Sequence, residues 1–355
     1  MTPSAHEIGC AVIGFGAMHN FGWMHATWIN TTPELKLCAI CDRDPERLRA
    51  AAAAFPGIKT YGSTRELYAD PKIEMVTLVT PNYTHCALAL EAFANGRHVL
   101  TENAMCLTVA EASAMIDASK AAGKMICVHH NRRHDGNYRL IKEIIDSGRI
   151  GEVFHVELSP SHYGNPFAST PSTWWADQTR SGGSYYYYGP QAIDWILDLV
   201  PHPIASVTGF SHKLVWHEMT NEDQVTAIIR FENGAVANFT ESHIDCAPKP
   251  FWRILGTKGA IVDGGKDATK GYQENTCAPS TGSLRLITLR NGDPHEEVVP
   301  YKDSDWHMFY RDIASHLLRG TPVPITGECG RRVIGVLETA RASCRSGKTE
   351  GVLHK

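Results

Sequence analysis

The chain lacks any long apolar run: nothing in its 355 residues approaches the roughly 20 consecutive apolar residues that span a bilayer. It also lacks a basic excess, because 34 Lys and Arg stand against 38 Asp and Glu, for a formal net charge of −4. A chain without a positive field is poorly suited to binding phosphate backbones. We therefore expect neither a membrane nor a nucleic acid among its partners.

The opening stretch MTPSAHEIGCAVIGFG lacks the charged, apolar and small-residue regions of a signal peptide. It leads almost directly into a strand-like apolar run. We therefore expect a cytoplasmic protein.

The ten cysteines show no metal-binding or redox motif. Cys38 and Cys41 form a C-x-x-C pair, but they lie in an expected strand, where residues three apart point to opposite faces. A redox pair would also need a helix that begins just after its first cysteine. We interpret the cysteines as small core residues and expect no metal site.

What the chain does have is the composition of a soluble protein with two domains, at 43% hydrophobic and 20% charged residues. From residue 8, short apolar runs alternate with helical patterns. The expected strands cover 8–14, 35–42, 75–81, 98–102 and 124–130, and the expected helices cover 21–29, 45–55, 84–96 and 109–123. Strands joined by crossover helices predict a doubly wound parallel sheet, an α/β Rossmann domain over residues 1–128.

A glycine-rich loop directly follows the first expected strand. Gly14 suits a tight turn there, and Gly16 allows a pyrophosphate to approach the backbone at the start of the next helix. The usual third glycine is missing from the following positions. Asp42, at the end of the second expected strand, can accept hydrogen bonds from ribose hydroxyls and would repel a 2′-phosphate. The pattern predicts NAD as the cofactor, and the adjacent Arg43 leaves NADP open.

Two further loops lie at the carboxyl ends of expected strands, where ligands bind in such sheets. They are TPNYTH at 80–85 and TENA at 101–104, and we expect both to flank the cofactor. The predicted cofactor contacts are Gly14, Gly16, Ala17, Met18, Asp42, Arg43, Thr80, Pro81, Asn82, His85, Glu102, Asn103 and Asn131.

Residues 129–355 carry a different pattern, which predicts a second, α+β domain for substrate binding and oligomerisation. After a helical stretch at 137–148, strand-like alternation occurs at 152–159, 206–214, 224–233 and 235–242. Asn233 and Gly234 form the pair typical of a tight antiparallel hairpin. The helical tail at 304–345 can pack back on the first domain.

Several segments stand in a characteristic order along nearly the whole chain. They are VIGFGAM, ICDRDPER, VTPNYTHCALALEAFANGRHVLTEN, HHNRRHDGNYRLIKEIIDSGRIGEV, SGGSYYYYGPQAIDW, ILGTKGAIVDGG and the tail from DWHMFYRD. In this order they resemble the glucose–fructose oxidoreductase, inositol dehydrogenase and MocA (Gfo/Idh/MocA) family of NAD(P)-dependent sugar and cyclitol oxidoreductases. The resemblance implies a large, mostly antiparallel open sheet in the second domain. One face of that sheet would lie over the nicotinamide and the other in a subunit interface, which implies a homodimer or homotetramer.

The catalytic positions depart from the pattern of the family that the chain resembles. In that family a Lys after the fourth strand lies near the reacting hydroxyl, and here Asn103 stands in its place. The family's Asp and its general-base His, four residues apart, align with Tyr187 and Gln191. Gln cannot titrate and Asn carries no charge. The usual proton-handling groups have therefore been exchanged.

Oxidising a secondary alcohol still requires a base for the hydroxyl proton. Tyr187 can serve if a positive nicotinamide lowers its pKa from the usual value near 10. If the run 185–188 is extended, Tyr187 shares a face with Tyr185; packing and stacking on a sugar are the other uses of these rings.

Histidines in loops or at strand ends are further candidates for the base, namely His85, His129, His130, His134, His155, His162 and His243. The predicted catalytic residues are Tyr187, Asn103, Gln191 and His162, and the predicted substrate contacts are Arg132, Tyr163, Trp174, Trp175, Tyr185 and Asp194.

Three functions fit these features. The first is an NAD-dependent oxidoreductase acting on a secondary hydroxyl, or the matching ketone, of a sugar, glycoside or cyclitol. The second is a lyase or glycosidase that retains its NAD and acts by transient ring oxidation and elimination. The third is a non-catalytic protein that binds the dinucleotide.

Overall fold

The computed structural model describes residues 7–16, 20–168, 173–263 and 282–352. The chain divides into two compact units. The first unit comprises residues 1–129 and 307–331, and the second comprises 130–306 and 332–355. Within the described residues, no helix has the length and apolar character needed to cross a membrane.

The first unit is built on a six-stranded parallel sheet in the order β3-β2-β1-β4-β5-β6. Its strands are β1 (Ile8–Ile13), β2 (Leu35–Cys41), β3 (Lys59–Tyr61), β4 (Met75–Leu78), β5 (His98–Thr101) and β6 (Ile126–Val128). The strand order reverses direction between β1 and β4, and such a switch point opens a ligand crevice at the carboxyl ends of the strands. The predicted doubly wound sheet is confirmed.

Local sequence signals set the helix ends of the first unit. The Asp44 side chain accepts a hydrogen bond from Glu46 N and caps α2, and Thr108 and Glu111 form a capping box at the start of α5. Gly123, with φ +60°, ends α5 in the left-handed conformation that favours glycine. The helices of this unit are α1 (Phe21–Thr31), α2 (Pro45–Ala54), α3 (Thr64–Tyr68), α4 (His85–Ala94), α5 (Val109–Ala122) and α9 (His307–Arg319).

The second unit is built on an eight-stranded sheet in the order β14-β13-β12-β11-β7-β10-β9-β8. Among these strands only β7 and β10 pair in parallel, so the predicted mostly antiparallel sheet is confirmed. The strands are β7 (Val153–Leu158), β8 (Ile204–His212), β9 (Gln224–Phe231), β10 (Val236–Ser242), β11 (Trp252–Gly256), β12 (Gly259–Asp263), β13 (Ser283–Arg290) and β14 (Asp293–Pro300). The predicted hairpin joins β9 and β10, where Gly234 has φ +89°.

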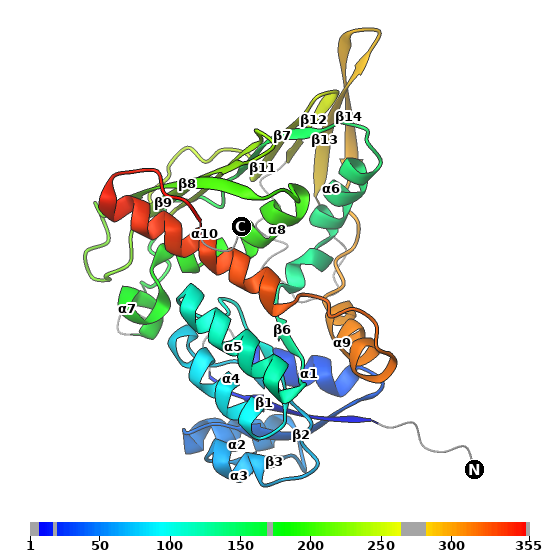
Figure 1. Cartoon of the computed structure of the whole chain (residues 1–355), viewed down its shortest axis with the longest axis vertical. Helices are drawn as coiled ribbons and strands as arrows, with labels where there is room; N and C mark the ends of the chain where they lie inside the picture. Colours follow the sequence, from blue (N-terminus) through cyan, green and yellow to red (C-terminus); the bar gives the residue numbers. More distant parts are fainter. Residues whose placement is uncertain (1–6, 17–19, 169–172, 264–281, 353–355) are drawn as a thin grey trace. The chain divides into compact units, whose positions relative to one another are not determined.

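Helix α8 (Gly189–Leu199) packs on β7 and β10, and α6 (Gly136–Asp146) packs on α8 (Figure 1). Their contact includes the stacked rings of Tyr138 and Trp195, whose centroids are 5.5 Å apart. The remaining helices are the short α7 (Gln178–Ser181) and the long α10 (Gly327–Ser346), which begins in the first unit and continues in the second. This packing places the start of α8 beside the end of β10.

Candidate functional site

The glycine loop after β1 has the backbone that a dinucleotide requires. Gly14 has φ +101°, and a Cβ there would lie 2.4 Å from the carbonyl oxygen of Val79, so no other residue fits. No atom of the described residues lies within 4 Å of a Cβ placed on Gly16, so the backbone there is open to a ligand. Ala17 and Met18 lie outside the described residues.

The carboxylate of Asp42 lies against this loop. Asp42 Oδ2 accepts a hydrogen bond from the backbone N–H of Phe15 at 2.7 Å, and Oδ1 accepts one from Asp44 N at 2.9 Å. Both contacts come from backbone donors, which fix the carboxylate at the edge of the loop. The exposed Arg43 follows it.

The loop after β4 is tied to the loop after β5 by a buried histidine. His85 has its Nε2 2.7 Å from Thr80 O and its Nδ1 2.9 Å from Ala104 O, and its side chain has no exposed surface. Burial lowers the pKa of His85, and a neutral ring donates to only one of these two carbonyls at a time. The prediction that His85 contacts the cofactor is therefore wrong, because the ring holds the two loops together instead. Thr80, Pro81 and Asn82 remain at the carboxyl end of β4, as predicted from the sequence.

Asn103, which the sequence resemblance aligned with a Lys, has a defined amide orientation. Its Nδ2 donates to Glu102 Oε2 at 2.8 Å and to the carbonyl oxygen of His129 at 3.2 Å. Both partners can only accept, so the amide nitrogen faces them. The carbonyl oxygen Oδ1 is the atom left for a ligand. This position therefore offers a hydrogen-bond acceptor where a Lys would offer a charged donor.

Two buried imidazoles form hydrogen bonds with the carboxylate of Glu102. His25 Nε2 and His129 Nδ1 each lie 2.7 Å from Glu102 Oε1, and His25 Nδ1 lies 2.5 Å from the hydroxyl of Tyr310. Burial opposes ionisation of Glu102, but the charge and hydrogen bonds of His129 and His25 outweigh it and hold the pKa of Glu102 well below its usual value. An ionised Glu102 can accept from both rings and from Asn103 together.

The three residues His25, Glu102 and His129 are also of the types that bind metals. Their geometry is that of hydrogen bonds, because each imidazole nitrogen lies 2.7 Å from the shared carboxylate oxygen. Ligand atoms around a tetrahedral zinc ion would be about 3.3 Å apart, given metal–ligand bonds of about 2.0 Å. The cluster therefore functions as a positioning network for Glu102 and Asn103.

The tyrosine run in the second unit is not extended. Gly182 and Gly183 have φ +95° and +84°, and they turn the chain into a 3₁₀ helix over Ser184–Tyr186. Tyr185 is consequently buried, and its hydroxyl donates towards the carbonyl oxygens of Phe210 and Thr226. The prediction that Tyr185 shares a face with Tyr187 and binds substrate is therefore wrong.

Tyr187 lies in an aromatic cluster at the start of α8. Its ring makes edge-to-face contacts with Phe167, Trp175 and His243, at centroid distances of 5.8, 5.5 and 5.7 Å. Burial raises the pKa of Tyr187 to about 12. At neutral pH the residue is a phenol, which can donate a proton.

Gln191 and Asn131 lie together, with Gln191 Nε2 3.5 Å from Asn131 Oδ1. Both are buried and belong to the second unit. Asp194 lies in the interior of α8, and its two carboxylate oxygens accept from Nε and Nη2 of Arg133 at 2.8 and 2.9 Å. The predicted substrate contact of Asp194 is therefore wrong, because this buried carboxylate is occupied by the guanidinium of Arg133.

The side chains Arg132, Trp174 and Trp175, predicted to bind substrate, are each partly exposed. The Arg132 guanidinium lies 5.0 Å from the ring centroid of Trp306 and 5.8 Å from that of Tyr188. Trp174 and Trp175 lie against each other at 4.6 Å. These rings and the guanidinium have partly exposed surface that a ligand can contact.

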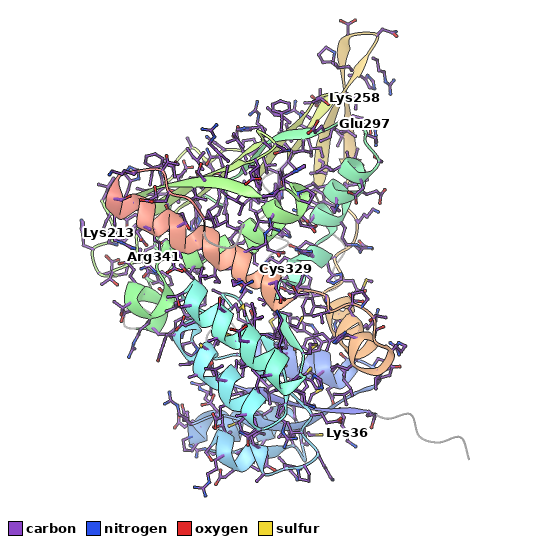
Figure 2. All side chains as sticks on the ribbon, in the orientation of Figure 1. Lys36, Lys213, Lys258, Glu297, Cys329 and Arg341 are labelled. Atoms are coloured by element: carbon purple, nitrogen blue, oxygen red, sulfur yellow. The ribbon has the colours of Figure 1, made fainter. Side chains whose placement is uncertain are left out.

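His162 and Tyr163 lie on the chain that follows β7. His162 is exposed, and its backbone N–H donates to Ser242 O at 2.9 Å. Tyr163, 55% exposed, packs on Trp216 with the ring centroids 5.6 Å apart. Trp216 belongs to the loop after β8, which Lys213 (labelled in Figure 2) anchors by donating to Trp216 O at 2.5 Å.

Sequence reasoning missed the importance of two residues at the end of β10. His243 was one of seven histidines without a distinguishing signal, and Glu241 was not considered. The alternation of β10 could have placed both on the same face as Phe239, which packs under Gly189 of α8. Only the structure shows that this face meets Tyr187.

Two family models cover the chain. Residues 8–130 match the model described as "Oxidoreductase family, NAD-binding Rossmann fold", and residues 138–262 match the "GFO/IDH/MocA C-terminal domain". The chain belongs to the Gfo/Idh/MocA family. The predicted resemblance is thus confirmed, and the first unit is the family's NAD-binding Rossmann domain.

Members of the family with assigned activities resemble this chain over most of its length. It is 24% identical over 353 residues to scyllo-inositol 2-dehydrogenase (NADP(+)) of Bacillus subtilis strain 168, covering 96% of this chain and 95% of that one. It is 28% identical over 289 residues to scyllo-inositol 2-dehydrogenase (NAD(+)) of the same organism, covering 78% and 79%. The WlbA dehydrogenase of Bordetella pertussis, solved with NADH and UDP-GlcNAcA, has the same fold: the TM-score is 0.81 at 22% identity, over 98% and 99% of the two chains.

Proposed function

We propose that this Gfo/Idh/MocA protein is an NAD-dependent oxidoreductase. It acts on a secondary hydroxyl, or the matching ketone, of a sugar, glycoside or cyclitol, and Tyr187 carries the proton. The observation that carries the proposal is the position of Tyr187, a protonated phenol set in a cluster of two aromatic rings and a histidine. The two scyllo-inositol dehydrogenases among its relatives support the substrate class.

The residues of the first unit fit a nicotinamide dinucleotide. The open backbone at Gly16 can take the pyrophosphate, and the carboxylate of Asp42 can take the ribose hydroxyls. Asp42 supports NAD over NADP, because a 2′-phosphate beside it would be repelled by a carboxylate that backbone N–H groups hold in place. When bound, the nicotinamide supplies hydride transfer, and the protein has to manage the proton.

Of the three residues aligned with the family's catalytic positions, Tyr187 is the one that can transfer a proton. Gln191 does not titrate, and Asn103 offers only a neutral carbonyl oxygen to a ligand. With a pKa of about 12, Tyr187 is poised to donate its proton to a carbonyl oxygen, which is the direction of ketone reduction.

The proposed assembly is a homodimer or homotetramer through the eight-stranded sheet. Phe154 on β7 and Phe210 on β8 support it, since their side chains are 46% and 50% exposed. The cytoplasmic location stays a prediction.

A panel of cyclitols, sugars and their ketones tests the proposal, with NAD(H) and NADP(H) absorbance followed at 340 nm and products identified by mass spectrometry. We expect turnover of at least one polyol–ketone pair, with a lower KM for NAD(H) than for NADP(H). The Tyr187→Phe variant should lose about 10²- to 10⁴-fold in kcat while keeping its thermal stability and NAD affinity.

Tyr186→Phe is the matched control, because this neighbouring buried ring lies under the guanidinium of Arg341 (labelled in Figure 2) and away from the Tyr187 cluster. Undiminished turnover by Tyr187→Phe would remove Tyr187 as the proton carrier. Altered products without net NADH formation would show a redox-neutral reaction and contradict the proposed function. Failure to bind NAD would contradict it altogether.

A further inference from the structure

His243 is a buried imidazole whose hydrogen-bonding groups are unused. It follows the last residue of β10, and its side chain is 2% exposed. Within the described part of the chain, neither ring nitrogen has a hydrogen-bond partner. Leaving a buried polar ring without hydrogen-bond partners destabilises the fold, and a ligand that supplies the partner would remove that cost.

The backbone around His243 holds the ring in one place. The His243 N–H donates to Asp223 O at 2.8 Å, and the His243 carbonyl accepts from Trp216 Nε1 at 3.1 Å and from Gly164 N at 3.0 Å. These contacts come from the loop after β8 and the chain after β7. The ring is therefore placed before any ligand binds.

The ring of His243 faces the groups already assigned to the substrate site. Its centroid lies 5.7 Å from that of Tyr187 and 5.1 Å from that of His162. Glu241, two residues earlier on the same face of β10, has Oε1 3.7 Å from His243 Nε2. That distance is too long for a hydrogen bond, so Glu241 does not satisfy the ring nitrogen of His243.

Glu241 and His243 form an uncharged pair. Glu241 is 2% exposed and accepts a hydrogen bond from Tyr188 N at 3.1 Å, and no Lys or Arg of the described residues pairs with it. Burial raises the pKa of Glu241 well above its usual value, and burial together with the nearby His162 lowers the pKa of His243 to about 3. A neutral carboxylic acid and a neutral imidazole can each both donate and accept. Such groups match alcohol hydroxyls, which also do both.

We propose that His243 and Glu241 form a binding subsite for a second, neutral hydroxyl of the substrate ring, which they position while Tyr187 handles the proton of the reacting one. The inference rests on the proposed function, because it takes the Tyr187 cluster as the reaction site. It narrows the substrate class to rings with at least two free hydroxyls.

The test compares a polyol that the enzyme turns over with each of its monodeoxy derivatives. In the wild type, at least one derivative should lose about 5- to 100-fold in kcat/KM, because its missing hydroxyl leaves His243 unpaired. In His243→Phe the KM for the parent polyol should rise by a similar factor, kcat should change less than about threefold, and the discrimination against that derivative should disappear. His243→Gln, which keeps a donor and an acceptor, should recover part of the affinity.

The variant Glu241→Gln tests whether Glu241 binds the hydroxyl as a neutral carboxyl group or as a charged carboxylate. An amide mimics a protonated carboxyl, so this variant should remain within about threefold of the wild type in KM. A loss as large as that of His243→Phe would overturn the neutral subsite. His212→Gln, an exposed histidine on β8, is the matched control for histidine loss, and thermal melts of all variants check folding.

The outcomes distinguish the inference from the proposed function. If Tyr187→Phe is inactive while His243→Phe keeps the wild-type KM and discrimination, the subsite is wrong and the function stands. If the wild type turns over no polyol, the function is wrong. Quenching of tryptophan fluorescence by scyllo-inositol in the presence of NAD, lost in His243→Phe and kept in His212→Gln, would then support the subsite; no quenching, or equal quenching in all three proteins, would overturn it.

Discussion

At Tyr187, the raised pKa makes the two directions of the reaction respond differently to pH. The phenol with its pKa near 12 is protonated throughout the neutral range, so it is always ready to donate. Titration of Tyr187 should therefore leave log kcat/KM for ketone reduction unchanged between about pH 6 and pH 9. Oxidation needs the phenolate, so its log kcat/KM should rise by about one per pH unit until the pKa is reached.

Initial rates in both directions over this pH range, with enzyme stability checked at each pH, measure the effect. The Tyr187→Phe variant should abolish the rise in the oxidation profile. A wild-type oxidation rate that levels off near pH 6.5, the ordinary pKa of a histidine, would instead identify an imidazole as the base and contradict the role of Tyr187.

Individual residues differed in how far the sequence could predict their surroundings. The tight turn at Gly14 and the location of Asp42 beside it could be predicted, because both follow from their places at the ends of strands, and their contacts to a cofactor stay predictions. Tyr185 and Asp194 could not, since their partners Phe210 and Arg133 are distant in sequence. From the sequence, both side chains were expected to bind a substrate. In the folded chain, each forms hydrogen bonds with a residue that is distant in sequence.

Among the secondary elements, most strands of the first unit and the hairpin of the second could be predicted, whereas β3 and the four strands β11 to β14 were not expected. The hairpin between β9 and β10 follows from Asn233-Gly234 and the alternation on either side. Strand β3, by contrast, has three residues, none of them buried, and was not expected. Its pairing with β2 comes from the sheet, not from its own sequence.

The loop after β5 depends on a network that joins three elements of the first unit. His25 comes from α1, Glu102 follows β5, His129 follows β6, and their contacts orient Asn103. These residues are up to 104 positions apart in the chain, from His25 to His129, so no sequence motif links them. The network explains how a Lys position can be occupied by Asn and still be fixed in orientation.

Glu102→Gln tests this network. A glutamine has one acceptor oxygen, so its amide nitrogen must face either the two imidazoles or the two N–H groups of Asn103. We expect a loss of about 2–4 kcal/mol in the free energy of unfolding at pH 7, together with a reduced kcat as Asn103 loses its orientation. Chemical denaturation and steady-state kinetics measure the two effects.

The pH dependence gives the same experiment a second readout. The pKa of Glu102 is lower in the folded protein than its ordinary value of 4.5, so its ionisation stabilises the fold above pH 4.5 and this contribution is lost as the pH falls below it. The stability difference between wild type and Glu102→Gln should therefore shrink below that pH. Glu46→Gln, at an exposed position of α2, is the control and should show no such difference at any pH.

Across the whole molecule, the chain completes its first unit with a segment from near its end. Residues 307–331 belong to the first unit although 130–306 form most of the second. In this segment the Tyr310 ring lies 6.1 Å from that of Trp28 and 5.9 Å from that of His25, and Ile325 O accepts from Val128 N on β6. The first unit is therefore discontinuous in sequence, and its last segment follows most of the second unit along the chain.

Tyr310→Ala tests whether that late segment holds the first unit together. Tyr310 is fully buried, and its removal leaves a cavity and takes the hydroxyl from His25, so we expect a loss of about 3–5 kcal/mol in the free energy of unfolding. Hydrogen exchange should accelerate in β1, α1 and β6 and stay unchanged in β9 and β10. Leu286→Ala, at a fully buried position of β13, is the matched control and should produce the reverse pattern. Equal acceleration of both units by either variant would contradict this prediction, because it would mean that the chain unfolds as one cooperative body.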